Sequence, residues 1–176
     1  ALGEYDAREL YDFIQDLKQG GMKHASDYPI DNMQKAMEIR KKISMVMVND
    51  EALRLFEMND KQDFSENYID VHTLDSVVIL QNLFSAIWYE NDSFEVIAKY
   101  KRRRSDQDLV LLSRVSIFGF EEKKCKVIKS GTDISELVLK EKQIARQNNL
   151  AEALSNSTMA LLEEGVSSNQ LVKALG

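Results

Sequence analysis

Three consecutive segments with the composition of β-strands constrain the fold more than any other feature of this sequence. They are FEVIAKYKRR at 94–103, LVLLSRVSIFGF at 109–120 and CKVIKSGT at 125–132, and short polar turns separate them. The first segment alternates apolar and polar residues, which is typical of a strand with one buried face. Strands that follow one another through short turns pair as an antiparallel meander. The chain is therefore expected to contain an antiparallel sheet.

Helical patterns dominate the start of the chain. Apolar residues recur at helical spacing over Tyr5–Gln19, and a glycine pair ends this pattern. Asp31 or Asn32 can cap a second helix that reaches Arg40. Residues 1–41 are therefore expected to form a helical lead-in.

One strand and several helices are expected between this lead-in and the meander. Ile43–Val48 is rich in β-formers and too short for a helix, and Asn49 can cap a short helix behind it. Lys61–Val71 is polar and is expected to be irregular. Apolar residues then repeat at helical intervals over Val71–Asn91, which predicts the longest helix of the globular part. This order predicts an α+β fold, in which helices flank an antiparallel sheet and a long helix follows at the end.

The overall composition argues against several classes of protein. The 176 residues carry a formal net charge of −6, whereas a broad nucleic-acid surface needs an excess of Lys and Arg. The one cysteine, Cys125, cannot form an internal disulfide, which suits a reducing compartment. No apolar run reaches the length of about 18 residues that a membrane span requires. We therefore expect no nucleic acid as partner and no membrane span in this chain.

Motifs for catalysis, metals or cofactors are missing from the sequence. It has no glycine-rich phosphate loop and no His-Glu-x-x-His, and Cys125 has no Cys or His neighbour to complete a metal site. His24 is interpreted as a solvated loop residue. His72 is interpreted as a polar residue in a first helical turn, with cavity lining or haem ligation as the alternative. We therefore expect no catalytic residues, no metal and no bound cofactor.

The strongest concentration of positive charge is KYKRRR at Lys99–Arg104. Such a run could contact nucleic acid or an anionic partner. However, Asp106, Asp108 and Glu121 follow closely in the sequence and offset its charge. We therefore interpret the run as the solvated end of a hairpin.

The third strand segment leads almost directly into a long charged helix. Asp133 can accept backbone N–H groups as an N-cap, and Glu136 completes an Asp-x-x-Glu capping-box pattern. Ile134 can pack back on the sheet. A strand and a helix that are joined so tightly must move together. The residues expected to couple them are Asp133, Ile134, Ser135 and Glu136.

Three stretches resemble PAS sensory domains, namely VMVNDEALRLF, FEVIAKYKRRRSDQDLVLLSRVSIF and KVIKSGTDISELVLKEK. Asp-Ile-Ser at 133–135 stands where the family carries Asp-Ile-Thr, and the resemblance covers residues 43–140. It implies a sensory module of a bacterial two-component or related signalling protein, of the histidine kinase or diguanylate cyclase type. It also implies a cytoplasmic location and a downstream output domain that receives the signal through the last helix.

The resemblance divides the chain into three parts. Residues 1–41 are similar to the helical lead-in of some bacterial PAS proteins, and residues 42–135 are the PAS-like sensory domain. Residues 136–176 are the signalling helix, whose sequence from Asn149 onward resembles the first helices of a GAF domain.

Two apolar stripes predict a homodimer, because they present more apolar surface than a lone PAS core covers. The stripe on the first helix comprises Leu10, Phe13 and Leu17. The stripe on the last helix follows near-heptad spacing and comprises Ile134, Leu137, Ile144, Ala151 and Leu154, with Glu141 and Asn148 as polar interruptions.

The resemblance also implies a pocket between the inner face of the sheet and the long internal helix. The candidates to line it are Phe56, Tyr68, His72, Leu74, Val78, Phe84, Val96, Ala98, Val115 and Ile117. Because the sequence patterns of flavin and haem proteins are missing, an unidentified small molecule is the expected ligand. The alternative function is a ligand-free dimerisation scaffold that holds downstream domains together.

Overall fold

The computed structural model describes residues 1–121 and 124–174, without the side chains of residues 69, 157–158 and 160–174. The contacts of the chain separate two compact units. The first comprises Ala1–Ser135 and holds an antiparallel sheet with its helices, and the second begins at Glu136 within one long helix.

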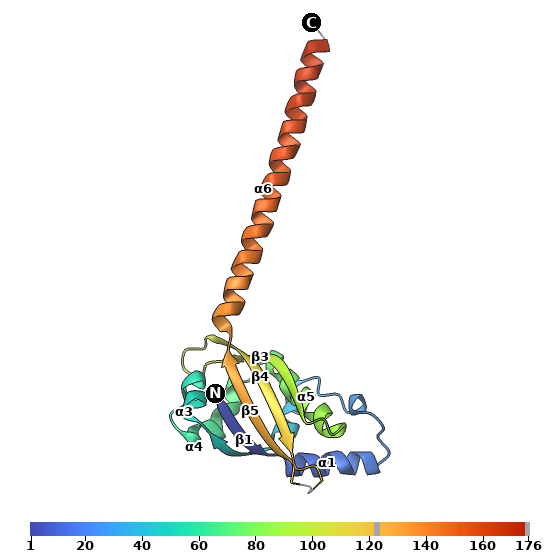
Figure 1. The fold of residues 1–176 in the computed structure, drawn as a ribbon, viewed down its shortest axis with the longest axis vertical. Helices are drawn as coiled ribbons and strands as arrows, with labels where there is room; N and C mark the ends of the chain where they lie inside the picture. Colours follow the sequence, from blue (N-terminus) through green and yellow to red (C-terminus); the bar gives the residue numbers. More distant parts are fainter. Residues whose placement is uncertain (122–123, 175–176) are drawn as a thin grey trace. The chain divides into compact units, whose positions relative to one another are not determined.

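The sheet has five strands: β1 (Leu2–Asp6), β2 (Ser44–Val48), β3 (Ser93–Lys101), β4 (Asp108–Phe118) and β5 (Lys126–Asp133) (Figure 1). Their order is β2-β1-β5-β4-β3, and every neighbouring pair is antiparallel. The predicted meander is confirmed as β3–β4–β5, and the predicted strand before Asn49 is confirmed as β2. The fold is α+β, as the order of elements predicts.

Strand β1 lies inside the sheet, between β2 and β5, whereas the sequence pattern predicts a helix that starts at Tyr5. Tyr5 pairs with Val127 of β5 on one side and with Met45 of β2 on the other. The Asp6 carboxylate accepts the backbone N–H of Arg8 at 3.0 Å, so the chain turns from strand to helix at this point. Helical periodicity begins only behind this turn. Extending the helix back to Tyr5 is therefore wrong.

Helices α1 (Arg8–Gln19) and α2 (Met33–Arg40) lie between β1 and β2 in the sequence. The predicted cap of α2 is confirmed, because Asn32 Oδ1 accepts the backbone N–H of Lys35 at 3.0 Å.

The apolar stripe of α1 faces the core of its own unit. Leu10 is fully buried, and Phe13 and Leu17 pack against the same core cluster. Burying a side chain such as that of leucine contributes about 1.5–3 kcal/mol to folding. The apolar stripe of α1 is thus buried within one chain, so it gives no reason to expect a homodimer.

Three helices follow β2, namely α3 (Asp50–Phe56), α4 (Lys61–Asn67) and α5 (Val77–Trp88). The predicted cap of α3 is confirmed, because Asn49 Oδ1 accepts the backbone N–H of Ala52 at 3.0 Å. The same oxygen accepts the backbone N–H of Leu2 at 2.9 Å and so ties α3 to β1.

Two expectations about the segment before α5 are wrong. The stretch expected to be irregular contains α4, which Asp60 caps by accepting the N–H of Asp63 at 2.8 Å. Phe64 is the one buried residue of this short helix, so its sequence carries little helical periodicity. The predicted long helix begins at Val77 and not at Val71, because short 3₁₀ turns precede it, and at 12 residues it equals α1 in length instead of exceeding it.

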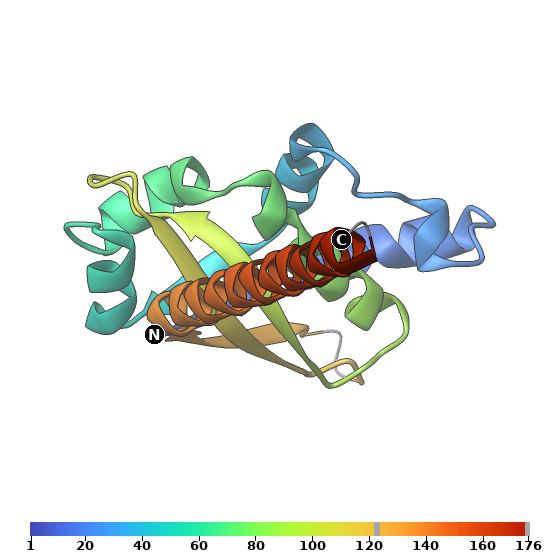
Figure 2. The ribbon, with the colours of Figure 1, turned by 90° about the horizontal axis from the view of Figure 1, so that it is seen from above.

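The helices pack on one face of the sheet (Figure 2), and the buried residues form two clusters between these layers. The larger cluster lies under α1, α2 and α5. The smaller one lies under α3 and α4, and its aromatic side chains are Phe56, Phe64, Tyr68 and Tyr100.

The second unit continues helix α6 (Ser135–Ala174). Val138 is half-buried, and the large apolar residues Leu137, Ile144, Leu150 and Leu154 are solvent-exposed. Across the described residues of both units, no helix is both long enough and apolar enough to cross a membrane.

Candidate functional site

A cavity of about 50 Å³ lies in the first unit between the sheet and its helices, with space for a few atoms. Helix α5, strands β3, β4 and β5 and Ile43 supply apolar walls, so most of the surface that faces the cavity is apolar, and a few polar side chains, including Lys129 of β5, border it. The lining residues are Tyr5, Arg40, Ile43, Tyr68, His72, Ile79, Leu80, Leu83, Phe94, Val115, Val127 and Lys129.

A lysine on the inner face of β5 borders this cavity. Burial alternates along the strand, so Lys129 shares the inner face with Val127 and Gly131. The Lys129 Nζ donates to the Tyr100 hydroxyl at 2.9 Å and to the Tyr68 hydroxyl at 3.3 Å. Both tyrosines are buried, so the ammonium is held by phenol oxygens inside the protein.

His72 lies beside these tyrosines and has one unsatisfied nitrogen. Its Nδ1 lies 2.7 Å from Ser76 Oγ, which is also 2.8 Å from the carbonyl oxygen of Thr73. Because the single hydroxyl hydrogen of Ser76 is donated to this carbonyl, Nδ1–H of His72 must be the donor to Ser76. In this tautomer the Nε2 atom of His72 is a hydrogen-bond acceptor. This atom is buried and has no hydrogen-bond partner among the described residues.

Arg40, the last residue of α2, contributes a second cation. Its Nη1 donates to the carbonyl oxygen of Ile43 at 2.5 Å, and its guanidinium lies over the Tyr68 ring at 5.7 Å. Arg40, Ile43 and Tyr68 also border a surface groove of about 470 Å³ that includes Met37 and Ser65. These three residues therefore stand between the groove and the cavity.

We refer to Tyr5, Arg40, Tyr68, His72, Tyr100 and Lys129 as the cavity cluster. Burial, opposed by Tyr5 and assisted by the charge of Arg40, lowers the pKa of Lys129 to about 8. Burial and the charges of Lys129 and Arg40 lower the pKa of His72 to about 3. Burial raises the pKa of Tyr5 to about 12 and that of Tyr100 well above its usual value. At pH 7 the cluster thus combines neutral tyrosines, a neutral histidine and two cations.

No acidic side chain offsets these two cations. Within the described part of the chain, neither Arg40 nor Lys129 forms an ion pair with an Asp or a Glu. Both residues are half-buried, and charges withdrawn from water are normally paired, because removing an ion from water is costly. The cluster is therefore an electropositive site that lacks a counter-charge.

The structure brings three of the predicted pocket residues to this cavity, namely Tyr68, His72 and Val115. The others lie elsewhere. Phe56 and Ala98 are buried in the smaller core cluster, with Val78 against it, and Phe84 and Ile117 are buried in the larger one, with Val96 against it.

Leu74 is not a pocket residue, because its side chain is 71% exposed. The predicted helix from Val71 would turn it toward the core, but residues 74–76 form a 3₁₀ turn instead.

Sequence reasoning missed Tyr5, Arg40, Tyr100 and Lys129. The sequence pattern could have indicated two of them, because Tyr100 and Lys129 occupy inward positions of strands in which burial alternates. Tyr5 was hidden because its strand was expected to be helical.

The other residues considered for chemistry have ordinary surroundings. Cys125 is fully buried, and burial raises the pKa of its thiol to about 12, so the thiol stays protonated. His24 is exposed. No group of three His, Cys, Asp or Glu side chains that could hold a metal is found among the described residues.

The junction between β5 and α6 is fixed by side-chain bonds that differ from the predicted capping box. Asp133 Oδ1 accepts the backbone N–H of Ser135 at 2.9 Å and the hydroxyl of Ser135 at 2.6 Å. Ser135 Oγ also accepts the N–H of Val110, and the N–H of Ile134 donates to the carbonyl of Val110, each at 2.9 Å. The carboxylate therefore bonds two residues ahead, as in an Asx turn, while Glu136 pairs at 3.9 Å with Lys140 within the second unit.

The basic run in the β3–β4 turn is bound to its own domain. Arg102 donates to the Asp133 carboxylate and to the carbonyl of Leu55, each at 2.8 Å. Burial alone would raise the pKa of Asp133, but its bonds to Ser135 and the charge of Arg102 hold it below its usual value.

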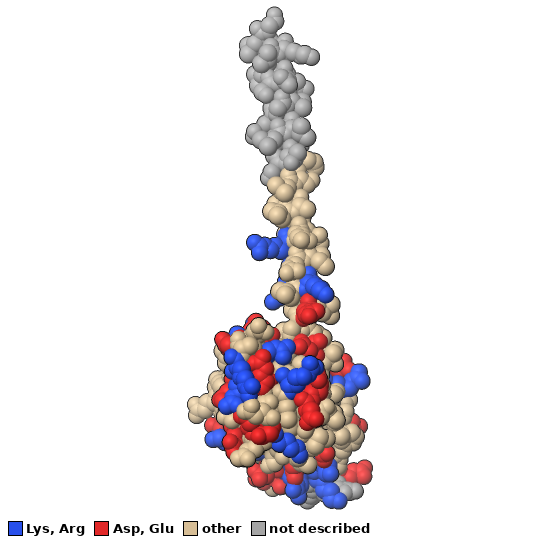
Figure 3. Space-filling model, turned by 90° about the vertical axis from the view of Figure 1, so that its left-hand side faces the viewer, with Lys and Arg blue, Asp and Glu red and all other residues tan. Residues whose placement is uncertain are grey.

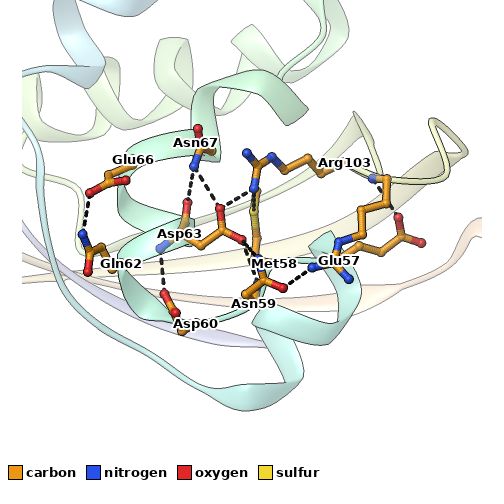
Figure 4. A network of polar contacts seen from close by, with 10 residues as sticks. Glu57, Met58, Asn59, Asp60, Gln62, Asp63, Glu66, Asn67 and Arg103 are labelled. Carbon is orange, nitrogen blue, oxygen red and sulfur yellow. Dashed lines mark hydrogen bonds and ion pairs between the residues drawn. The ribbon is translucent and has the colours of Figure 1, made fainter.

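Figure 4 shows that Arg103 reaches Asp63 of α4 and Met58, which lies between α3 and α4. Arg103 pairs with Asp63, and Arg104 bonds the amide oxygen of Asn59. Glu57 accepts the backbone N–H groups of Arg104 and Ser105 at 2.9 and 2.8 Å.

We refer to Arg102, Arg103 and Arg104 with these partners as the arginine clamp. Figure 3 shows basic and acidic side chains interspersed over this side of the first unit. The run is the exposed end of the β3–β4 hairpin, as predicted, and its arginines are also matched by partners of the same unit.

No protein-family model matches the chain, and no curated protein matches it. Its function has to be argued from the cavity cluster, the arginine clamp and the junction at Asp133.

Proposed function

We propose that the chain is a sensory module in which a small molecule in the cavity alters strand β5 and, through it, helix α6. One observation carries the proposal. Lys129 borders the cavity and Asp133 fixes the junction, and both residues belong to strand β5. An even number of positions separates them, so they belong to the same face of the strand. At about 3.3 Å per residue, roughly 13 Å of strand separates them.

The junction is suited to pass on a displacement of β5. Asp133 holds Ser135 through two hydrogen bonds, and Ile134 and Ser135 are both bonded to Val110 of β4. A shift of the strand end therefore shifts the first residues of α6. Arg102 extends the connection to α3, since it bonds both Asp133 and Leu55.

The PAS resemblance supports this proposal through the order of elements. One strand, small helices, a longer helix, a three-stranded antiparallel meander and a final long helix follow each other in the first unit and into the second. On this basis we propose a bacterial signalling protein of the histidine kinase or diguanylate cyclase type. We further propose that it is cytoplasmic, that a downstream domain provides the output, and that this chain itself performs no catalysis.

Native mass spectrometry of the purified protein tests the small-molecule part of this proposal. We expect a retained mass of small-molecule size, and no absorbance beyond the protein band, because flavin and haem patterns are missing from the sequence. Protein that carries no added mass and binds no small molecule in a screen would contradict sensing by the cavity.

A second candidate function is a dimerisation scaffold, favoured by the exposed apolar side chains of α6. Leu137, Ile144 and Leu154 are between 55% and 61% exposed in the chain alone. Sedimentation should then show a homodimer at micromolar concentration, and Ile144→Asp should dissociate it. A monomer at high micromolar concentration would exclude the scaffold.

A further inference from the structure

We infer that the cavity binds a small carboxylic acid as its anion, with the carboxylate at Lys129 and Arg40 and an apolar body against α5. This inference rests on the proposed sensory function and assigns the chemical class of its ligand.

The first argument is the missing counter-charge. The Lys129 ammonium has three donor hydrogens and directs two of them to Tyr100 and Tyr68. Arg40 has five donor N–H groups, and its one hydrogen bond goes to the carbonyl of Ile43. Donors therefore remain on both cations, while the described chain offers no acid to either of them. A carboxylate would supply both the negative charge and the acceptor oxygens.

The second argument concerns the protonation and the hydrogen bonding of the tyrosines and the histidine that lie near the two cations. Tyr5, Tyr68 and Tyr100 keep their protons at neutral pH, since burial raises the pKa of each. Tyr5 and Tyr68, which border the cavity, can donate to a ligand oxygen, but none of the three can neutralise the cations. His72 Nε2 is an unpartnered acceptor, so a hydroxyl or water accompanying the ligand would satisfy it.

The third argument concerns the size and polarity of the remaining walls. Ile79, Leu80 and Leu83 of α5 face Phe94 and Val115 of the sheet across the cavity. At about 50 Å³ the space suits a short aliphatic chain, and it excludes a dinucleotide or a haem.

An access route is present beside the cations. The surface groove and the cavity share Arg40, Ile43 and Tyr68 as their common wall. Arg40 therefore meets an incoming anion first, and a rotation of its side chain would open the cavity behind it.

Matched pairs of acid and amide test the inference, because an amide copies the shape of the acid without its charge. Acetate, propionate, butyrate and benzoate are titrated against the whole chain at pH 7 by ligand-observed NMR, each beside its own amide. We expect at least one acid to bind about tenfold or more tightly than its amide, because hydrogen bonds to charged groups are the stronger ones.

Variants locate the binding. Lys129→Met should abolish acid binding, and Arg40→Gln should weaken it about tenfold. Lys126→Met is the matched control, because Lys126 lies on β5 but on the exposed outer face, where it pairs with Glu4 at 3.6 Å. Dispersed amide NMR spectra check that each variant is folded, and Arg40→Gln decides the question if Lys129→Met is not.

The outcomes separate the two proposals. Equal binding of acid and amide, or full acid binding by the folded Lys129→Met variant, overturns the anion assignment and leaves a small-molecule sensor in place. A neutral compound retained in native mass spectrometry does the same. If no acid or amide binds and no mass is retained, both the ligand class and small-molecule sensing are wrong.

Discussion

The cavity cluster and the arginine clamp are both basic regions of the first unit, but they treat their charges in opposite ways. In the clamp, Arg102 and Arg103 each meet a carboxylate, from Asp133 and Asp63 respectively. In the cavity cluster, Lys129 and Arg40 meet phenol and carbonyl oxygens only.

The difference indicates which basic residues stabilise the fold and which are available to bind a ligand. A cation whose acid lies on a neighbouring element stabilises the contact between those elements, although such pairs are individually modest when exposed. A cation enclosed without an acid costs free energy in the empty protein. We therefore expect substitutions in the clamp to lower the free energy of unfolding. Substitutions of Lys129 and Arg40 should leave the free energy of unfolding nearly unchanged and remove ligand binding.

The largest effect is expected at Phe56, which touches both regions. Its carbonyl accepts the N–H of Arg103, and its ring lies edge-to-face against Tyr68 and Tyr100, each at 5.4 Å between centroids. Phe56→Ala should lower the free energy of unfolding by about 3–5 kcal/mol, measured by urea denaturation. Leu74→Ala, at an exposed site, should stay within about 0.5 kcal/mol of the parent. A similar small loss in Phe56→Ala would mean that the two regions are not packed through this ring.

The next effect is a pH dependence that comes from the cavity cluster. The pKa of Lys129 is about 8 in the folded chain, below its ordinary value of 10.5. Between these values the unfolded chain binds more protons, so the free energy of unfolding should rise with pH, by up to about 1.4 kcal/mol per unit. Denaturant unfolding between pH 8 and 10 should show this rise in the parent relative to Lys129→Met. Identical pH profiles of the two proteins would mean that Lys129 is not held as an enclosed cation.

A smaller loss is expected at the clamp residue that also fixes the junction. Asp133→Ala removes the acceptor for Ser135 and the partner of Arg102, and should cost about 0.5–2 kcal/mol, the usual loss for a helix cap. Asp133→Asn keeps an acceptor for Ser135 and should cost less. In a protein that carries the proposed output domain, Asp133→Ala should also uncouple output from ligand, whereas Lys140→Ala should behave as the parent. Parental stability together with normal regulation in Asp133→Ala would refute the coupling role of this junction.

The smallest effect on stability is expected for Lys129→Met, a substitution in the cavity cluster. It loses two hydrogen bonds to tyrosines but also removes a charge that is costly to enclose. At pH 7 the free energy of unfolding should change by no more than about 1 kcal/mol in either direction. A loss as large as that of Phe56→Ala would make Lys129 a structural residue and would end the distinction between the two regions.

Local patterns predicted much of this fold because they depend on neighbouring residues. Alternation predicted the meander, and the caps at Asn32 and Asn49 were identified from side chains that bond their own helix. Strand β1 was missed because its sequence LGEYD contains a glycine and two acidic residues, which are uncommon in strands, and both of its partners are distant in sequence. Helix α4 was missed because Phe64 alone is buried there.

The candidate site was harder to predict than the fold. Arg40 ends a helix in what was taken as a separate lead-in, and it reaches the cavity only because β1 and β2 hold that segment against the sheet. Lys129 could have been noticed as a charge at an inward position of β5. Its lack of an acidic partner is visible only once every neighbouring element is in place.

The position of β1 between β2 and β5 has a consequence for how the chain folds during synthesis. This strand leaves the ribosome before both of its partners, and Leu2 must wait for Ser130 before it can pair with β5. The meander forms from contacts that are close in sequence, whereas the closing of the sheet is a long-range event and therefore slow. Until β1 inserts, β2 and β5 both present open edges, which readily pair with other nascent chains. Early access of residues 2–6 to the finished meander thus decides whether newly made protein folds or aggregates.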